Sequence, residues 1–209
     1  MLAIRGVGSK IATEMMGMLN GVLVVPVARN EAVPLNAERY LFCAGILRPK
    51  TAEEQTAEEI EEGHRVNFLQ IKEDCERIFK VNRRARVCVI GSESAYRGSY
   101  DGTYAWSKQL LHEYVQTKPL GTRQQLVCIS PCPIQDAGQH ARRKDRFRTE
   151  QRRLAHPQQR FLKAYEVARL VKFLLYEDGG YITGIVIRMN GGEHIKDNAC
   201  QRPIFKIAS

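Results

Sequence analysis

The sequence predicts an α/β fold, a doubly wound parallel sheet with helices on both faces. Short apolar runs alternate with longer amphipathic stretches, which is typical of strand–helix–strand units around a parallel sheet. β-branched residues dominate several of these runs, as they do in buried parallel strands. The chain of 209 residues suits one core and shows no repeat, so we expect a single domain over residues 1–209.

Each element of this fold has its own signal. The apolar runs are the expected strands, at 2–5, 22–28, 39–44, 86–90, 125–130 and 184–189. The amphipathic stretches are the expected helices, at 9–20, 52–80, 103–117 and 164–177. In the last helix an apolar stripe recurs with the period of one helical face, through Val167, Leu170, Val171, Leu174 and Leu175. Right-handed crossovers would join the strands into the doubly wound sheet.

Composition narrows the class of protein. The chain is 44% hydrophobic and 26% charged, has no apolar run of 18 residues, and opens with MLAIRGVGSK, which lacks the layout of a signal peptide. We therefore expect a cytoplasmic protein without a membrane partner. The six cysteines form no CxxC motif, so we expect reduced thiols and no metal site.

The net charge of the chain is +9, and much of the excess lies in one basic stretch, residues 142–163, which has two interpretations. Nine Lys and Arg residues lie within 142–163, against Asp145 and Glu150. They could recognise an anionic small-molecule substrate through arginine forks, or form a solvated and partly disordered loop. We do not expect nucleic acid as a partner, because Phe147 and Phe161 are the only aromatic side chains nearby for stacking on bases.

In open parallel sheets, ligands bind beyond the carboxyl ends of the strands. The residues that follow the expected strands are mostly small or polar: Gly6-Val7-Gly8-Ser9, Gly45, Gly91-Ser92-Glu93-Ser94, Pro131-Cys132 and Asn190-Gly191-Gly192. We therefore look for the chemistry of this protein at these positions.

Tyr104 and Lys108 are four residues apart in an expected helix, so they share one face. A nearby ammonium favours the phenolate and lowers the pKa of a tyrosine, which allows proton exchange with an alcohol or a carbonyl. Ser92 at the preceding strand end could hydrogen-bond the same substrate oxygen. On its own, a tyrosine four residues before a lysine is equally compatible with ordinary helix packing.

The surrounding residues resemble the short-chain dehydrogenase/reductase family. The stretch VCVIGSESAYRGSYDGTYAWSK, residues 87–108, is similar to the family's strand that ends in serine before a Tyr-x-x-x-Lys helix. Four more segments resemble the family in the same order: LFCAGI (41–46), GHRVNFLQI (63–71), ISPCPIQDAG (129–138) and YITGIVIRMNGGEH (181–194). The resemblance implies a Rossmann-like fold and an oxidoreductase.

The resemblance also implies roles for matching residues. Tyr104 would be the acid/base, Lys108 would lower its pKa and bind the nicotinamide ribose, and Ser92 would polarise the carbonyl. Asn67 would hold a water in the proton relay, although an asparagine that satisfies the backbone is an equal alternative. Ser94 competes with Ser92 for the serine role.

The cofactor half departs from the family pattern, which has Thr-Gly-x-x-x-Gly-x-Gly after the first strand. Only Gly6 and Gly8 are available here, and we interpret them, with Ser9, as a shortened phosphate-binding turn. Between Gly8 and Gly45 there is room for one strand and one helix, where the family has two such units. We therefore expect a sheet that lacks one strand–helix unit and has a more open adenosine site.

Other matching positions would line the cofactor. Ala44, Gly45 and Pro131 correspond to segments that face it in the family. Arg29 lies where the family uses a basic residue for the 2'-phosphate of NADP, so NADP is weakly favoured over NAD, although a solvated loop charge is the simpler interpretation of Arg29. The family's usual residues are replaced at three places in these segments: its two asparagines by Phe42-Cys43, its glycine after proline by Cys132, and its aspartate by Asn190. We expect these changes to affect cofactor affinity more than the fold.

The sequence thus predicts an NAD(P)-dependent oxidoreductase that interconverts a carbonyl and a secondary alcohol, with Tyr104 as the acid/base. The alternative is a non-catalytic protein of the same fold that binds a nucleotide, a protein or RNA. The resemblance implies that residues 139–162 form a lid over the substrate. It also implies that helices near 52–80 and 103–117 mediate a homodimer or homotetramer.

Overall fold

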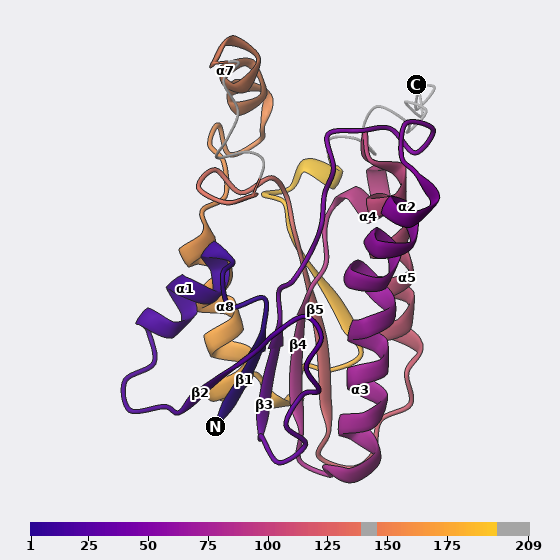
Figure 1. The fold of residues 1–209 in the computed structure, drawn as a ribbon. Coiled ribbons are helices and arrows are strands. Elements are labelled where there is room, and N and C mark those ends of the chain that lie inside the picture. Colours follow the sequence, from indigo (N-terminus) through magenta and orange to yellow (C-terminus); the bar gives the residue numbers. More distant parts are fainter. Residues whose placement is uncertain (139–145, 196–209) are drawn as a thin grey trace, which may run out of the picture.

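The computed structural model describes residues 1–138 and 146–195. Six strands form one fully parallel sheet in the order β2-β1-β3-β4-β5-β6 (Figure 1). The strands are β1 (Leu2–Arg5), β2 (Val24–Val27), β3 (Arg39–Phe42), β4 (Arg86–Ile90), β5 (Gln125–Pro131) and β6 (Ile185–Met189). All six expected strands are present, so the predicted doubly wound parallel sheet is confirmed.

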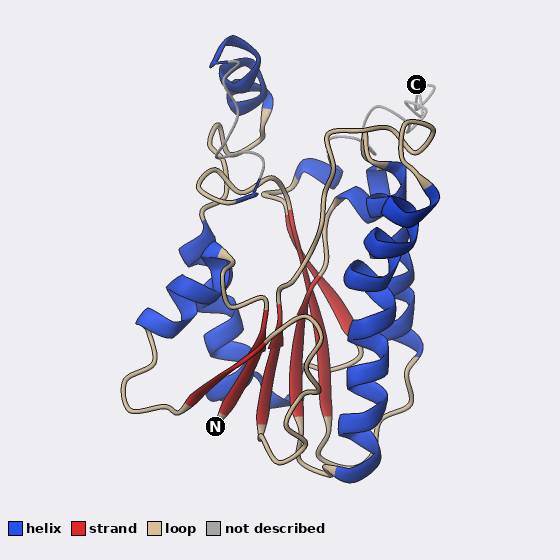
Figure 2. Cartoon of the chain, in the orientation of Figure 1, coloured by secondary structure: helices blue, strands red, loops and turns tan. Residues whose placement is uncertain are grey.

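Helices cover both faces of the sheet (Figure 2). One face carries α2 (Ala57–His64), the π-helical turn η1 (Arg65–Leu69), α3 (Gln70–Val81) and α5 (Gly102–Thr117). The other face carries α1 (Lys10–Gly17) and α8 (Ala164–Tyr176). The remaining helical elements are α4 (Ser94–Arg97), α7 (Arg146–Ala155) and the 3₁₀ turn η2 (Asp178–Tyr181). No helix in the described part of the chain is both long and apolar enough to cross a bilayer.

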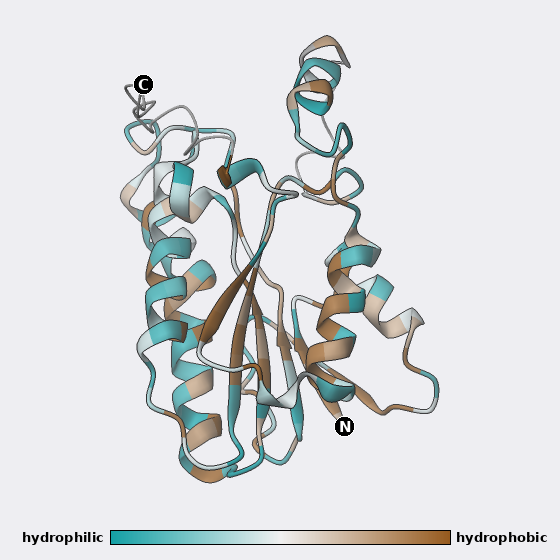
Figure 3. Ribbon diagram, turned by 180° about the vertical axis from the view of Figure 1, so that it is seen from behind, coloured by the Kyte–Doolittle hydropathy of each residue, from teal (hydrophilic) through white to brown (hydrophobic). Residues whose placement is uncertain are grey.

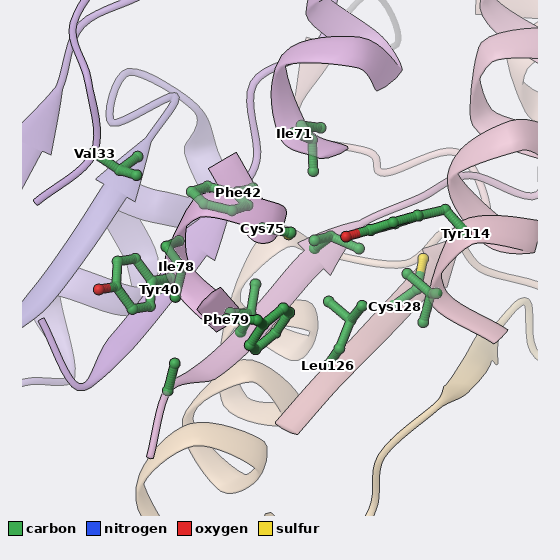
Figure 4. Close-up of a cluster of buried hydrophobic side chains, with 14 of the residues drawn as sticks. Val33, Tyr40, Phe42, Ile71, Cys75, Ile78, Phe79, Tyr114, Leu126 and Cys128 are labelled. Atoms are coloured by element: carbon green, nitrogen blue, oxygen red, sulfur yellow. The ribbon is translucent and has the colours of Figure 1, made fainter. Parts of the chain in front are cut away.

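The strand sequences alternate between two apolar cores. Ala3 on β1 packs with the α3 and α5 side, whereas Leu2 and Ile4 pack with α1 and α8. Figure 4 shows the first core, which includes Phe42 and Leu126 from the sheet and Ile78 and Phe79 from α3. Figure 3 shows the corresponding apolar colouring along the strands and the inward helix faces. Burial on both faces explains why the strands are almost continuously apolar.

Three differences from the expected helices have local causes. The helix expected at 52–80 begins at Ala57, because Thr56 and Glu59 form a capping box there. The same helix widens into the π-helical turn η1, which contains Asn67. In the basic stretch, residues 146–155 form the helix α7 rather than a loop, while 139–145 lie outside the described residues.

The sheet lacks one unit of the family's usual pattern, as predicted. After β2 the chain passes through residues 28–38 without a helix and returns to the other side of β1 as β3. The strand order therefore reverses between β1 and β3. In sheets of this kind such a switch point opens the ligand crevice at the carboxyl ends of the strands.

Candidate active site

A cleft of about 790 Å³ opens at the switch point, beyond the carboxyl ends of β1, β3 and β4. We call it the strand-end cleft. Eight predicted site residues line it: Gly6, Gly8, Ser9, Arg29, Ala44, Gly45, Tyr104 and Lys108. Asn67, Ser92 and Pro131 are not among its lining residues. The predicted residues in this cleft therefore come from four separate segments of the chain.

The turn between β1 and α1 is packed tightly against the chain at Gly6 and has open space for a ligand at Gly8. Gly6 has φ +89°, and a Cβ at this position would lie 2.4 Å from the Ala44 nitrogen, so only glycine fits. A Cβ at Gly8 would meet nothing within 4 Å, because Gly8 faces the cleft. The Ser9 side chain caps α1 by accepting from Ala12 N at 3.1 Å. The N-terminus of α1, with its positive end of the helix dipole, therefore borders the cleft, as in phosphate-binding turns.

Asn67 builds the wall of the cleft beside β3. Its side chain is fully buried, its Oδ1 accepts from Ile46 N at 2.9 Å, and its Nδ2 donates to Ile46 O at 2.8 Å. Both polar groups of the side chain are thus used by the backbone after Gly45. This contact corresponds to the alternative interpretation, an asparagine that satisfies the backbone.

Tyr104, Lys108 and Ser92 come together at the inner end of the cleft. Asp101 begins α5 by accepting from Tyr104 N at 2.9 Å, which places the tyrosine in the first turn of the helix. Lys108 lies one turn later, with its Nζ 5.8 Å from the centre of the Tyr104 ring and donating to Ile90 O at 2.7 Å. The Ser92 side chain hydrogen-bonds the Tyr104 phenol. The structure thus brings together the three groups that the sequence singled out.

Ser92, rather than Ser94, is the serine that reaches Tyr104. The Ser92 Oγ also accepts from Ser94 N at 3.1 Å, so the same hydroxyl fixes the first turn of α4. Ser94 is the first residue of this short helix.

The sequence predicts a lowered pKa for the Tyr104 phenol, and the structure differs from this prediction. Burial raises the pKa of Tyr104 above its ordinary value, and the hydrogen bond from Ser92 offsets only part of this rise. Burial also lowers the pKa of Lys108 to about 8, against the opposing effect of the Cys128 and Cys43 thiols. The net effect raises the pKa of the phenol, so Tyr104 is protonated at neutral pH.

His112 is a further residue of this site, one that no motif in the sequence indicated. It follows Lys108 by one turn on the same face of α5, and its Nε2 accepts from the Ser92 backbone N at 3.4 Å. A Cβ at Gly91 would lie 2.2 Å from this nitrogen, which explains the glycine before Ser92. Burial, reinforced by Lys108, lowers the pKa of His112 to about 4, so the ring is neutral at physiological pH.

Arg29 lies at the far end of the cleft but already has a partner. Its guanidinium lies 2.5 Å from the Glu62 carboxylate, and both side chains are about half exposed. The Glu31 carboxylate accepts from Ala28 N at 3.0 Å. Arg5 stabilises the loop that carries Arg29 and Glu31 by donating hydrogen bonds to the carbonyls of Ala28 and Glu31.

Pro131 ends β5 beside the serine loop, where its carbonyl accepts from Glu93 N at 3.1 Å. Glu93 was not predicted, yet it joins three strand ends: it accepts from Ser130, Asn190 and the Arg188 guanidinium. Burial raises the pKa of its carboxyl, but these donors outweigh that effect and hold it below its ordinary value. Asn190, which replaces the family's aspartate, is therefore a partner of Glu93.

Within the described residues, no group of three or more His, Cys, Asp or Glu side chains is placed to hold a metal ion. Cys43, Cys75, Cys88, Cys128 and Cys132 are free thiols.

Comparisons with known proteins agree with this geometry. A family model described as enoyl-(acyl carrier protein) reductase matches residues 40–194. A short-chain dehydrogenase/reductase from Burkholderia thailandensis has the same fold, with a TM-score of 0.77 and 14% identity over 98% of both chains. The protein belongs to the short-chain dehydrogenase/reductase family. The matched region begins at Tyr40, so the first two strands and the glycine turn of this family member lie outside it.

Other solved structures share the fold at low identity. A short-chain dehydrogenase/reductase from Serratia marcescens is 19% identical, with a TM-score of 0.76 over 91% of this chain and 96% of that one. A structure titled ribose-5-phosphate isomerase from Brucella melitensis is 18% identical, with a TM-score of 0.78 over 98% and 97%. No curated protein sequence matches this chain. At these identities the structural likeness shows the fold, and the reaction has to be argued from the site.

Proposed function

We propose that the protein is an NAD(P)-dependent oxidoreductase that interconverts a carbonyl and a secondary alcohol. The observation that carries the proposal is the arrangement at the inner end of the strand-end cleft. There the Tyr104 phenol is hydrogen-bonded by Ser92 and lies one turn from Lys108, and Tyr104 and Lys108 open onto a cleft large enough for a dinucleotide.

The lining of the cleft fits a dinucleotide along its length. The open space at Gly8 and the N-terminus of α1 suit a pyrophosphate, because backbone N–H groups and the helix dipole favour negative charge there. Ala44 and Gly45 would border the adjoining ribose, and Lys108 would hold the ribose next to the reacting ring. A bound nicotinamide would supply or accept the hydride.

The proton would come from this chain's own residues. Because burial keeps the phenol of Tyr104 protonated at neutral pH, it is ready to donate to the oxygen of a carbonyl as that oxygen gains negative charge. The Ser92 hydroxyl would stabilise the same oxygen by a hydrogen bond. His112 fixes the backbone of Ser92, and Asn67 fixes the wall at Ile46, so both act as positioning residues.

We favour NADP over NAD. Arg29 lines the adenosine end of the cleft, and its exposed partner Glu62 could be replaced by a 2'-phosphate. The Glu31 carboxylate is already bonded to Ala28 N, which reduces its capacity to bind a ribose hydroxyl. A lower Kd for NADPH than for NADH is the expected result.

The proposal is tested by Tyr104→Phe, which removes the phenolic hydroxyl and keeps the ring. We expect kcat to fall by about 100-fold or more, because a positioned proton donor contributes on that order, while the Kd for the cofactor stays within about twofold. Tyr100→Phe is the matched control, because Tyr100 is 65% exposed before α5. Undiminished turnover in Tyr104→Phe would exclude Tyr104 as the acid/base.

The second candidate is a non-catalytic family member that binds a nucleotide, a protein or RNA. It is favoured by the position of the family match, which starts after the shortened glycine turn, and by the absence of a strand–helix unit between β2 and β3 in residues 28–38. Binding to RNA that weakens steeply with salt, together with no response to nicotinamide cofactors, would support it.

We further propose that the enzyme acts in the cytoplasm on a small-molecule substrate, as a homodimer or homotetramer. The assembly would use the outer face of α2 and α5, where Trp106 is half exposed and stacks on His64 at 4.5 Å. Sedimentation velocity of the full chain tests the assembly, and a monomer at micromolar concentration would contradict it.

A further inference from the structure

A second large pocket lies at the opposite end of the sheet from the strand-end cleft. Its volume is about 740 Å³, and we call it the basal pocket. Its lining comes from two segments, residues 76–83 at the end of α3 and residues 118–124 after α5. These segments lead into β4 and β5, so the pocket lies at the amino ends of these strands. Figure 1 shows the end of α3 at the opposite end of the sheet from α7.

Positive charge dominates the lining of the basal pocket. Four cationic side chains line it, against one carboxylate, that of Glu76: Arg77, Lys80, Arg83 and Lys118. The Glu76 carboxylate accepts hydrogen bonds from the Tyr114 hydroxyl at 3.0 Å and from Lys118 Nζ. The negative charge of Glu76 is therefore already paired with Lys118, and three cations of the lining remain.

These three cations, Arg77, Lys80 and Arg83, have no protein partner in the described part of the chain. Their side chains make no ion pair or hydrogen bond within residues 1–138 and 146–195, and all three residues are exposed. Arg77 and Lys80 are three residues apart in α3, so they share one face of the helix and repel each other. The helix dipole offsets part of this repulsion. An anion in the pocket would neutralise it more completely.

The side chain of Gln124 fixes the two segments of the lining to each other. Its Nε2 donates to Phe79 O at 2.7 Å and to Asn82 O at 2.9 Å, and its Oε1 accepts from Gly121 N at 2.8 Å. The two carbonyls at the end of α3 are thus occupied, although they would otherwise be free at a helix C-terminus and repel an anion. The pocket is formed before any ligand arrives, which lowers the entropic cost of binding.

Phosphate groups suit this lining better than carboxylates do. Arginine binds a phosphate through two parallel hydrogen bonds, and lysine binds it as a point charge. The three acceptor oxygens of a phosphate point in different directions, so they can accept from donors on both segments, whereas the two oxygens of a carboxylate lie in one plane. Three unpaired cations also favour a ligand with more than one negative charge. A volume of about 740 Å³ is typical of pockets for small organic molecules.

We propose that the basal pocket binds a small molecule that carries two or more phosphate groups. Arg77, Lys80 and Arg83 would bind the phosphates, and Phe79 and Pro119 offer apolar surface to the rest of the molecule. No residue is shared between the lining of this pocket and that of the strand-end cleft. The proposal therefore concerns a separate site and does not depend on the redox function.

The test is an NMR titration of the ¹⁵N-labelled full chain with pyrophosphate and, separately, with citrate, at constant ionic strength. We expect saturable shifts of the Gly121 and Thr122 amide resonances with pyrophosphate at a Kd of about 1 mM or below, and weaker binding of citrate. Pyrophosphate that binds only in the strand-end cleft would instead shift Gly6 and Gly8. The absence of saturable shifts at Gly121 and Thr122 would overturn the proposal, as would citrate binding as tight as that of pyrophosphate.

Two neighbouring arginines provide a matched pair of variants that assigns the site. Arg83→Gln and Arg84→Gln each remove one positive charge from an exposed residue, but only Arg83 lines the pocket. Arg83→Gln should raise the Kd for pyrophosphate about fivefold or more, and Arg84→Gln should leave it within about twofold of the wild type. Lys80→Glu, which places a negative charge in the lining, should abolish the shifts at Gly121 and Thr122. Unchanged binding in Arg83→Gln, or equal losses in Arg83→Gln and Arg84→Gln, would contradict the proposal.

Discussion

Tyr104, Lys108 and His112 occupy successive turns on one face of α5, and one polar atom of each is bonded to Ile90 or Ser92, at the carboxyl end of β4. Tyr104 is bonded by Ser92, Lys108 donates to Ile90 O, and His112 accepts from Ser92 N. The first two members of this row could be predicted from the sequence because their spacing is local. The contact of His112 could not, because it depends on how closely α5 approaches the strand at Gly91.

The pKa values at the site could not be predicted from spacing either. A lysine one turn from a tyrosine was expected to lower the pKa of the phenol, but burial raises it. Burial is a property of the packed molecule, set by how the neighbouring strands and helices enclose the ring. The same cause lowers the pKa of Lys108 to about 8 and that of His112 to about 4.

His112 should make the protein less stable in acid. In the unfolded chain it takes up a proton near pH 6.5, whereas in the folded protein it does so only near pH 4, so acid favours the unfolded state. We expect its contribution to the free energy of unfolding to fall by about 3 kcal/mol between pH 6.5 and pH 4. Urea unfolding of wild type and His112→Leu over this range measures it. Equal pH dependence in the two proteins would contradict the assignment.

Among the elements, periodicity predicted the six strands and four main helices because the apolar positions are set by the two cores. The ends of helices were less predictable, since they depend on caps such as Thr56 with Glu59. The sequence shows no pattern that predicts the π-helical turn at Asn67 or the helix α7. In α7, Phe147 and Leu154 are exposed, so no apolar stripe faced a core and the stretch resembled a loop.

The turn between β1 and α1 gives a prediction at this scale. Gly6→Ala should destabilise the protein by about 1–3 kcal/mol, because φ +89° is strained for alanine and the new methyl would overlap Ala44. Gly8→Ala should change stability by less than about 0.5 kcal/mol, since its methyl meets open space. The methyl would instead occupy the cleft and weaken cofactor binding about tenfold or more.

Denaturation curves and cofactor titrations of the two variants provide the measurement, each variant serving as the other's control. If Gly6→Ala and Gly8→Ala lost stability equally, or if Gly8→Ala bound cofactor as well as the wild type, the interpretation of this turn would be wrong.

At the scale of the whole molecule, a shorter route from β2 to β3 replaces the strand–helix unit that the family usually has there. The fully buried Arg5 supports that route: it pairs with Asp74 of α3 at 2.7 Å and donates to the carbonyls of Ala28, Arg29 and Glu31. The short connection between β2 and β3 could be predicted by counting residues. The supporting role of Arg5 could not, because in the sequence Arg5 is simply the last residue of an apolar strand. Its role depends on contacts 23 to 69 residues away.

Asp74→Ala should therefore cost about 3–5 kcal/mol of unfolding free energy, because it leaves a buried guanidinium without its counter-charge. Glu73→Ala is the control, since its pair with Arg65 is exposed and spans 3.7 Å, and it should cost less than about 1 kcal/mol. Urea unfolding at pH 7 measures both. Similar losses in the two variants would show that Arg5 does not support the loop in this way.

The central claim is that the strand-end cleft holds a nicotinamide dinucleotide, and thermal unfolding of the full chain with each of NAD, NADH, NADP and NADPH at about 1 mM tests it most directly. Binding with a Kd near 10 μM would stabilise the protein by about 2.7 kcal/mol and raise Tm by roughly 5–10 °C. We predict such a rise with at least one form, largest with NADPH and diminished in Gly8→Ala. No change in Tm with any of the four would contradict the claim and favour a non-catalytic family member.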